Sequence, residues 1–131
     1  MSLGERKYIV RDVMTPNPVS VKPDSSVWEA ILKMDELNIG ALPVVDEYGK
    51  LVGIFTERDL LRRVIAKGKD PRTTKIRDVM TPSPVSIGPD EPVEVAKSIM
   101  AKLKVRHLPV VDSEGRLIGI VSIKDIELIE A

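Results

Sequence analysis

"LPVVDEYGKLVGI" occupies residues 42–54, and "LPVVDSEGRLIGI" occupies residues 108–120. In each stretch an apolar run leads through an aspartate and a glycine into a second apolar run. This pattern predicts two short strands joined by a turn, with the glycine suited to a positive φ. The chain therefore carries the same predicted β-hairpin twice.

The similarity extends well beyond the hairpin. Residues 11–64 align with residues 77–130 without a gap, and 25 of the 54 paired positions are identical. A solenoid usually needs three or more repeats, so two copies favour a closed pair in which each copy buries its apolar face against the other. We predict a first repeat at 8–65, a linker rich in Gly, Pro and charge at 66–75, and a second repeat at 76–131.

Hydrophobic periodicity orders each repeat as strand, helix, strand, strand and helix. In the first repeat these elements are predicted at 18–21, 27–37, 41–45, 50–55 and 56–68. The matching segments of the second repeat are 84–87, 93–103, 108–111, 116–121 and the stretch from Ser122 onward. The first strand of each repeat is flanked by prolines, which indicates a sheet edge. The predicted fold class is α/β (α+β), built from two βαββα repeats.

Composition argues against several classes of protein. Lys+Arg and Asp+Glu are 20 each, so the net charge is zero, whereas a nucleic-acid binder usually shows a basic surplus. The absence of cysteine excludes disulfides, thiolate metal ligands and thiol catalysis. No apolar run approaches the roughly 18 residues of a membrane span, and the N-terminus has no apolar signal core. We therefore expect a soluble cytoplasmic protein.

The element order, the duplicated hairpin and the hydroxyl-x-x-Asp that closes each repeat resemble the CBS domain, named for cystathionine β-synthase. Two such domains in tandem resemble a Bateman module, and the resemblance covers residues 11 to about 129. It implies that the two repeats pack sheet to sheet with pseudo-twofold symmetry. It also implies clefts between them that bind AMP, ADP, ATP or S-adenosylmethionine, and pairing of modules into homodimers.

A hydroxyl side chain stands three residues before an aspartate in "GIFTERD" (53–59) and again in "GIVSIKD" (119–125). Locally this is a capping-box pattern, in which both side chains satisfy free N–H groups at a helix start. An aspartate there also suits a ribose diol, because a carboxylate accepts two hydrogen bonds and repels phosphate. The resemblance assigns ribose to the aspartates, and phosphate to the hydroxyls and to the basic residue before each aspartate. These residues are Thr56, Arg58 and Asp59 in the first repeat and Ser122, Lys124 and Asp125 in the second.

The resemblance also points to phosphate at two positions just ahead of each hairpin. Arg106 and His107 fill them in the second repeat, whereas Gly40 and Ala41 fill them in the first. The second repeat is therefore predicted to contribute more to phosphate binding, with side chains that reach toward either cleft. The alternative is that Arg106 is a solvated surface residue and that His107, the single histidine, has a structural role.

Adenine requires an apolar slot, which the resemblance places beside the first strand and the strand before the hydroxyl. The alternative for these apolar residues is an ordinary place in the core. The predicted adenine contacts are Val19, Ile54, Phe55, Val85, Ile120 and Val121.

No catalytic constellation stands out in the sequence. There is one histidine, no cysteine, no P-loop and no serine elbow, and the duplication alone explains why Asp59 and Asp125 occur as a pair. No metal-ligand cluster is visible, and Mg²⁺ is expected only as a companion of bound ATP.

The sequence therefore predicts a regulatory sensor and not an enzyme. Its ligand is expected to shift how the repeats pack, and an unknown downstream protein partner to detect that shift. The rival hypotheses are an interaction or scaffold module without a ligand and, less favoured by the charge balance, a nucleic-acid-binding module.

Overall fold

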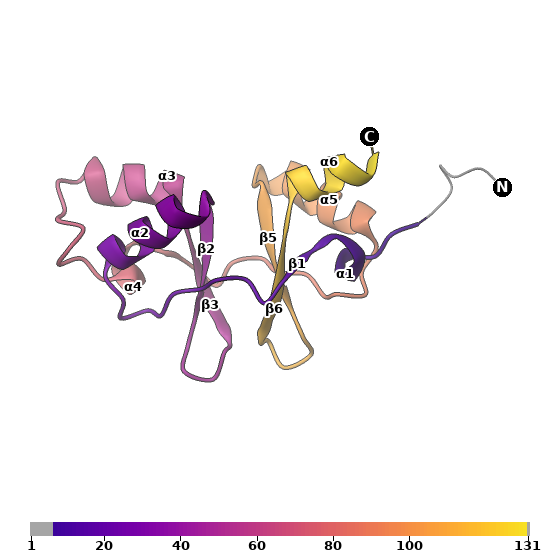
Figure 1. Cartoon of the computed structure of the whole chain (residues 1–131), viewed down its shortest axis with the longest axis horizontal. Helices are drawn as coiled ribbons and strands as arrows, with labels where there is room; N and C mark the ends of the chain where they lie inside the picture. Colours follow the sequence, from indigo (N-terminus) through magenta and orange to yellow (C-terminus); the bar gives the residue numbers. More distant parts are fainter. Residues whose placement is uncertain (1–6, 131) are drawn as a thin grey trace. The chain divides into compact units, whose positions relative to one another are not determined.

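The computed structural model describes residues 7–130 and divides the chain into two compact units. One unit runs from Val19 to Pro84. The other joins the chain up to Pro18 to the chain from Val85 onward (Figure 1). The compact units are therefore cut at different places from the sequence repeats.

The unit from Val19 to Pro84 contains a three-stranded antiparallel sheet in the order β2-β3-β4. Its strands are β2 (Ala41–Val45), β3 (Leu51–Thr56) and β4 (Thr81–Pro82). Its helices are α2 (Val27–Leu37), α3 (Glu57–Asp59), the π-helix η2 (Leu60–Ile65) and α4 (Ile76–Val79). In Figure 1 these helices lie on one side of the sheet.

The second unit repeats this arrangement with strands in the order β1-β6-β5. Its strands are β1 (Thr15–Pro16), β5 (His107–Val111) and β6 (Leu117–Ser122). Its helices are α1 (Val10–Val13), α5 (Val93–Leu103) and α6 (Ile123–Glu130). The mixed α/β class and the hairpins predicted from the sequence are confirmed.

Each unit has an apolar core beneath its helices. In α2 the buried residues Val27, Ala30 and Met34 recur at helical spacing and belong to the same cluster as Leu42 and Phe55. The corresponding cluster of the other unit includes the buried residues of α5 together with those of β5, β6 and α6. The helical periodicity at 27–37 and 93–103 was therefore a correct guide to the two long helices.

The hairpin turns depend on an aspartate and a glycine. Gly49 and Gly115 both have φ of +81°, a conformation that costs a glycine little. Asp112 accepts hydrogen bonds from the backbone N–H groups of Glu114 (2.9 Å) and Arg116 (3.0 Å). The Arg116 N–H is the main reason that the pKa of the Asp112 carboxyl lies below its usual value, with smaller contributions from the Glu114 N–H and the Arg116 charge. Desolvation opposes this shift.

The first strand of each repeat was predicted in the wrong place. The structure has strands at Thr15–Pro16 and Thr81–Pro82, whereas 18–21 and 84–87 contribute only single parallel bridges, Val21 to Val44 and Ile87 to Val110. Proline has no N–H to donate to a ladder, so these segments pair with the edge of a sheet through very few residues. The short helices α1 and α4, which precede these strands, were not predicted.

These short segments are exchanged between the repeats. β1 pairs with β6, with Thr15 opposite Ile120, and β4 pairs with β3, with Thr81 opposite Ile54. Each repeat of the sequence thus supplies its first strand to the sheet formed by the hairpin of the other repeat.

The segment 66–75, predicted as a linker, packs on the start of α2. The carbonyl of Thr74 accepts from the N–H of Val27 at 2.9 Å, and the carbonyl of Pro71 accepts from the N–H of Trp28 at 3.0 Å. The Arg72 guanidinium lies 4.7 Å from the centre of the Trp28 ring. Two N–H groups that a helix start leaves unpaired are therefore satisfied by this segment.

Candidate functional site

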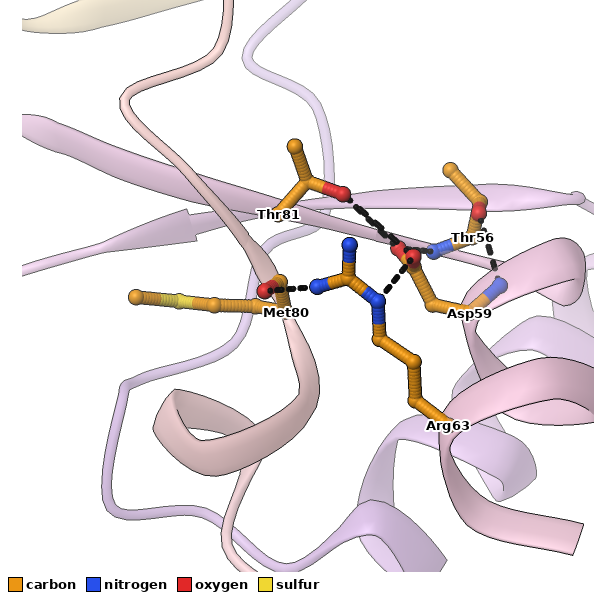
Figure 2. Close-up of polar contacts among 5 residues, drawn as sticks. All are labelled: Thr56, Asp59, Arg63, Met80 and Thr81. Carbon is orange, nitrogen blue, oxygen red and sulfur yellow. Dashed lines mark hydrogen bonds and ion pairs between the residues drawn. The ribbon is translucent and has the colours of Figure 1, made fainter. Parts of the chain in front are cut away.

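Asp59 lies just after the end of β3, where Thr56 caps the following helix. The N–H of Asp59 donates to the Thr56 hydroxyl at 3.1 Å, and the N–H of Thr56 donates to Oδ2 of Asp59 at 3.1 Å (Figure 2). The pair forms the capping box predicted from the sequence. The cap fixes the position of the carboxylate relative to the end of the strand.

Two further side chains hold the Asp59 carboxylate. The Thr81 hydroxyl donates to it, at 3.3 Å from Oδ1 and 3.4 Å from Oδ2. Nε of Arg63 lies 3.6 Å from Oδ1, and Nη1 of Arg63 donates to the Met80 carbonyl at 2.8 Å (Figure 2). With these neighbours Asp59 is only 7% exposed.

Asp125 occupies the equivalent place after β6. The N–H of Ser122 donates to its Oδ2 at 2.8 Å, and the N–H of Asp125 donates to the Ser122 hydroxyl at 3.1 Å. Asp125 is half-buried, unlike Asp59. A carboxylate accepts several hydrogen bonds, so Asp125 can keep its cap and also accept from the hydroxyls of a ligand.

Three of the four basic residues predicted for phosphate belong to the second unit. His107 of β5 lies opposite Ser122, and the Arg106 carbonyl accepts the N–H of Ile123 at 2.9 Å. Arg106 and Lys124 are exposed. The hairpin thus brings the backbone of Arg106 and His107 beside the start of α6, which carries Lys124 and the Ser122–Asp125 cap.

The matching place in the first unit is less basic. Ala41 is buried opposite Thr56, and the Gly40 carbonyl accepts the N–H of Glu57 at 3.0 Å. The Glu57 carboxylate lies so close to Gly40 that a Cβ added there would be 3.2 Å from its Oε1. Arg58 is exposed. A second carboxylate in this position disfavours phosphate.

The apolar residues predicted to contact adenine separate into two groups. Val19 and Val85 are 42% and 49% exposed, and Ile120 is half-buried. Phe55 and Val121 have no exposed surface and belong to the two cores, and Ile54 is 9% exposed. Phe55 and Val121 therefore serve packing, and neither residue has surface with which to contact a ligand in this structure.

Arg63 and Thr81 were not predicted from the sequence as neighbours of the Asp59 carboxylate. Arg63 stands four residues after Asp59, a spacing at which opposite charges meet on a helix. That signal was present in "DLLRR". Thr81 is 22 residues from Asp59 in the chain, so only the pairing of β4 with β3 reveals it.

A hollow of about 220 Å³ lies beside the start of α3, within the unit from Val19 to Pro84. Its volume is below the roughly 300–1,000 Å³ typical of sites that enclose a small molecule. Two carboxylates are in its lining, which does not suit phosphate. The lining residues are Ile31, Met34, Asp35, Asn38, Ile39, Glu57 and Leu60.

The CBS domain family model matches this chain twice, at residues 10–66 and 76–127. The chain belongs to the CBS domain family. The two matches form a tandem CBS pair, as the sequence resemblance implied. None of the helices in the described part of this CBS pair is long and apolar enough to cross a membrane.

Solved structures of CBS pairs share the fold of nearly the whole chain. The CBS domain pair of protein MJ0100, in complex with 5′-methylthioadenosine and S-adenosyl-L-methionine, has a TM-score of 0.87 and 34% identity. The match covers 95% of this chain and 97% of that one. CBSX2 in complex with AMP has a TM-score of 0.82 and 35% identity, with 94% and 96% covered.

A curated relative combines the CBS pair with a much longer chain. Inosine-5′-monophosphate dehydrogenase of Methanocaldococcus jannaschii is 42% identical over 132 residues, which cover 96% of this chain and 25% of that protein. The match thus concerns a quarter of the enzyme's length. No catalytic domain is evident among the residues matched to the CBS family.

Proposed function

We propose that this CBS pair is a regulatory module that binds adenosine-containing ligands. AMP, ADP, ATP and S-adenosylmethionine are the candidates. Asp125 and Asp59 bind the ribose hydroxyls, and phosphate lies with Ser122, Lys124, Arg106 and His107. The proposed contacts for adenine are Val19 and Ile54 in the unit from Val19 to Pro84, and Val85 and Ile120 in the other unit.

The observation that carries the proposal is the setting of Asp125. Its carboxylate is fixed by the Ser122 N–H at 2.8 Å, yet the residue is only half-buried. Hydrogen bonds from sugar hydroxyls to such a carboxylate contribute about 1.5–3 kcal/mol each. The complexes of MJ0100 and CBSX2 support this choice of ligand class, because these proteins share the fold and contain adenosine compounds.

The module acts as a switch in this proposal. A ligand shifts an equilibrium between two arrangements only when it binds one of them more tightly. A downstream protein then binds one arrangement in preference to the other. We further propose that two modules form a homodimer and that Mg²⁺ accompanies ATP when ATP is the ligand.

Thermal unfolding with AMP, ADP, ATP with and without Mg²⁺, S-adenosylmethionine and NADH tests the proposal. A ligand that binds the native state raises the unfolding midpoint, because it stabilises that state by about 2.7 kcal/mol when its concentration is 100 times Kd. Asp125→Asn should reduce this effect while the free protein unfolds close to wild type, since the amide oxygen still accepts the Ser122 N–H. Glu127→Gln, which removes an exposed carboxylate of the same helix outside the proposed site, is the matched control.

The absence of a shift at millimolar ligand across the whole panel would instead support an interaction module without a ligand. Light scattering of the same samples measures whether the module is a dimer.

A further inference from the structure

The two carboxylates are equivalent in sequence but are held differently. Asp59 is 7% exposed and is contacted by the Thr81 hydroxyl and by Nε of Arg63 in addition to its cap. Asp125 has the same cap and remains half-buried. The first repeat therefore supplies a cation to its own carboxylate.

The repeat that contains Asp125 lacks this arginine. The residue aligned with Arg63 is Ile129, which packs against the core of its own unit. The backbone differs as well: the chain after Asp59 is the π-helix η2, with the N–H of Ala66 donating to the Leu61 carbonyl at 2.9 Å, whereas α6 is α-helical. π-helical turns are rare and frequently occur at functional sites.

We propose that Arg63 closes the sugar-binding carboxylate of the first repeat, so that an adenosine ligand binds first at Asp125 and reaches Asp59 only when Arg63 moves away. This inference rests on the proposed function, because it concerns the occupancy of the same two sites. Arg63 is a specificity-determining residue in this view, and it makes the duplicated sites unequal.

The contacts of Arg63 explain why it competes with a ligand. It lies at Oδ1, one of the two oxygens that a ribose diol would use, and the Met80 carbonyl holds its Nη1 at 2.8 Å (Figure 2). Its charge also offsets the charge of Asp59, so the carboxylate attracts a hydroxyl donor less strongly.

Arg63 can nevertheless leave. Its side chain is 48% exposed, and its Nε lies 3.6 Å from Oδ1 of Asp59, beyond hydrogen-bond distance. Once solvated, the guanidinium loses one carboxylate contact and one carbonyl contact. The site at Asp59 is therefore closed at low ligand concentration and opens at high concentration.

Isothermal titration calorimetry of the full chain with adenosine and with AMP tests the proposal. Asp125→Asn removes the stronger site, and Arg63→Met is then added to remove the guanidinium while keeping an apolar stem. Arg62→Met in the same background is the control, because Arg62 is an exposed neighbour on η2 with the same charge. Thermal unfolding without ligand checks that each variant is folded.

We expect wild type to bind one tight and one weak equivalent. In the Asp125→Asn background, Arg63→Met should tighten binding of both adenosine and AMP roughly tenfold, about the effect of one charge-assisted contact. Arg63→Lys, which keeps a cation without the planar guanidinium, should give an intermediate affinity. Arg62→Met should leave both affinities unchanged.

An unchanged affinity in Arg63→Met overturns the proposal. Weaker AMP binding with unchanged adenosine binding also overturns it, since Arg63 would then be a phosphate ligand. If Arg63→Met unfolds early, Arg63→Lys decides, and an affinity equal to that of the parent counts against the proposal. A wild type that binds neither compound nor any other adenosine ligand refutes the proposed function itself, whereas wild-type binding with no effect of Arg63 refutes only this inference.

Discussion

The Thr56–Asp59 and Ser122–Asp125 pairs make the same two reciprocal hydrogen bonds at the end of a strand. The spacing of a hydroxyl and an aspartate is enough to produce the cap, because both partners lie within one helical turn. Burial and charge around the carboxylate come from other segments, and they differ. At the scale of single residues, the duplicated motif therefore determines where the carboxylate lies, while its neighbours determine how available it is to a ligand.

Asp112 gives a prediction about pH. Its pKa is lowered in the folded chain, chiefly by the Arg116 N–H, so the ionised form stabilises the fold. This contribution is complete above the unfolded value of about 3.9 and is lost as the pH falls through the lower folded pKa. Asp112→Asn should therefore flatten the acid side of the stability profile, measured by urea unfolding from pH 6 to pH 2.5. Parallel profiles for variant and wild type would contradict the prediction.

At the scale of elements, local patterns predicted local structure. The hairpins and the helices α2 and α5 follow from periodicity and turn residues within about a dozen positions. β1 and β4 could not be placed in this way, because each has two residues and pairs with the hairpin of the other repeat. Periodicity also gives no sign of the change from α3 to the π-helix η2.

The close approach of β3 and β4 can be tested at Gly53. A Cβ there would overlap the Met80 side chain and lie 3.1 Å from the Thr81 carbonyl oxygen. Gly53→Ala should lower the unfolding free energy by about 1–3 kcal/mol through overpacking. Gly88→Ala is the matched control, because its Cβ would meet only Cγ of Glu91 at 3.9 Å.

Chemical denaturation measures both variants. Adding Met80→Ala to Gly53→Ala should recover part of the lost stability, because it removes the overlap with the Met80 side chain. The recovery should be partial, because the close contact with the Thr81 carbonyl remains. Equal stability of the two alanine variants would show that β3 and β4 are not closely apposed.

At the scale of the whole molecule, the exchange of first segments means that each core contains residues from both repeats. Val10, of the first repeat, is fully buried in the core that α5, β5, β6 and α6 complete. Ile76, of the second repeat, is fully buried in the core of the unit from Val19 to Pro84. The sequence duplication predicted that two similar halves exist, but not that they trade these segments.

Amide hydrogen exchange can test whether each core depends on a segment from the other repeat. Val10→Ala should reduce protection mainly in residues 85–130, and Ile76→Ala mainly in 19–65, because each truncation leaves a cavity in that core. Each change should lower the local opening free energy by on the order of 2 kcal/mol. Mass spectrometry of peptides from native-state exchange resolves the two regions. Loss of protection only in the sequence repeat that carries the substitution would contradict the exchange of segments between the repeats.

The exchange of segments between the repeats also determines the order in which strands can pair while the chain is being synthesised. Domains generally fold as units while the chain is being made, and the unit from Val19 to Pro84 is fully synthesised first. β1 emerges earlier still, yet its partner strand β6 ends at Ser122, so β1 stays unpaired until the second hairpin has been synthesised. The Thr-Pro-Asn-Pro sequence at 15–18 reduces the risk of aggregation while β1 is unpaired, because prolines make an exposed strand a poor template for pairing with another chain.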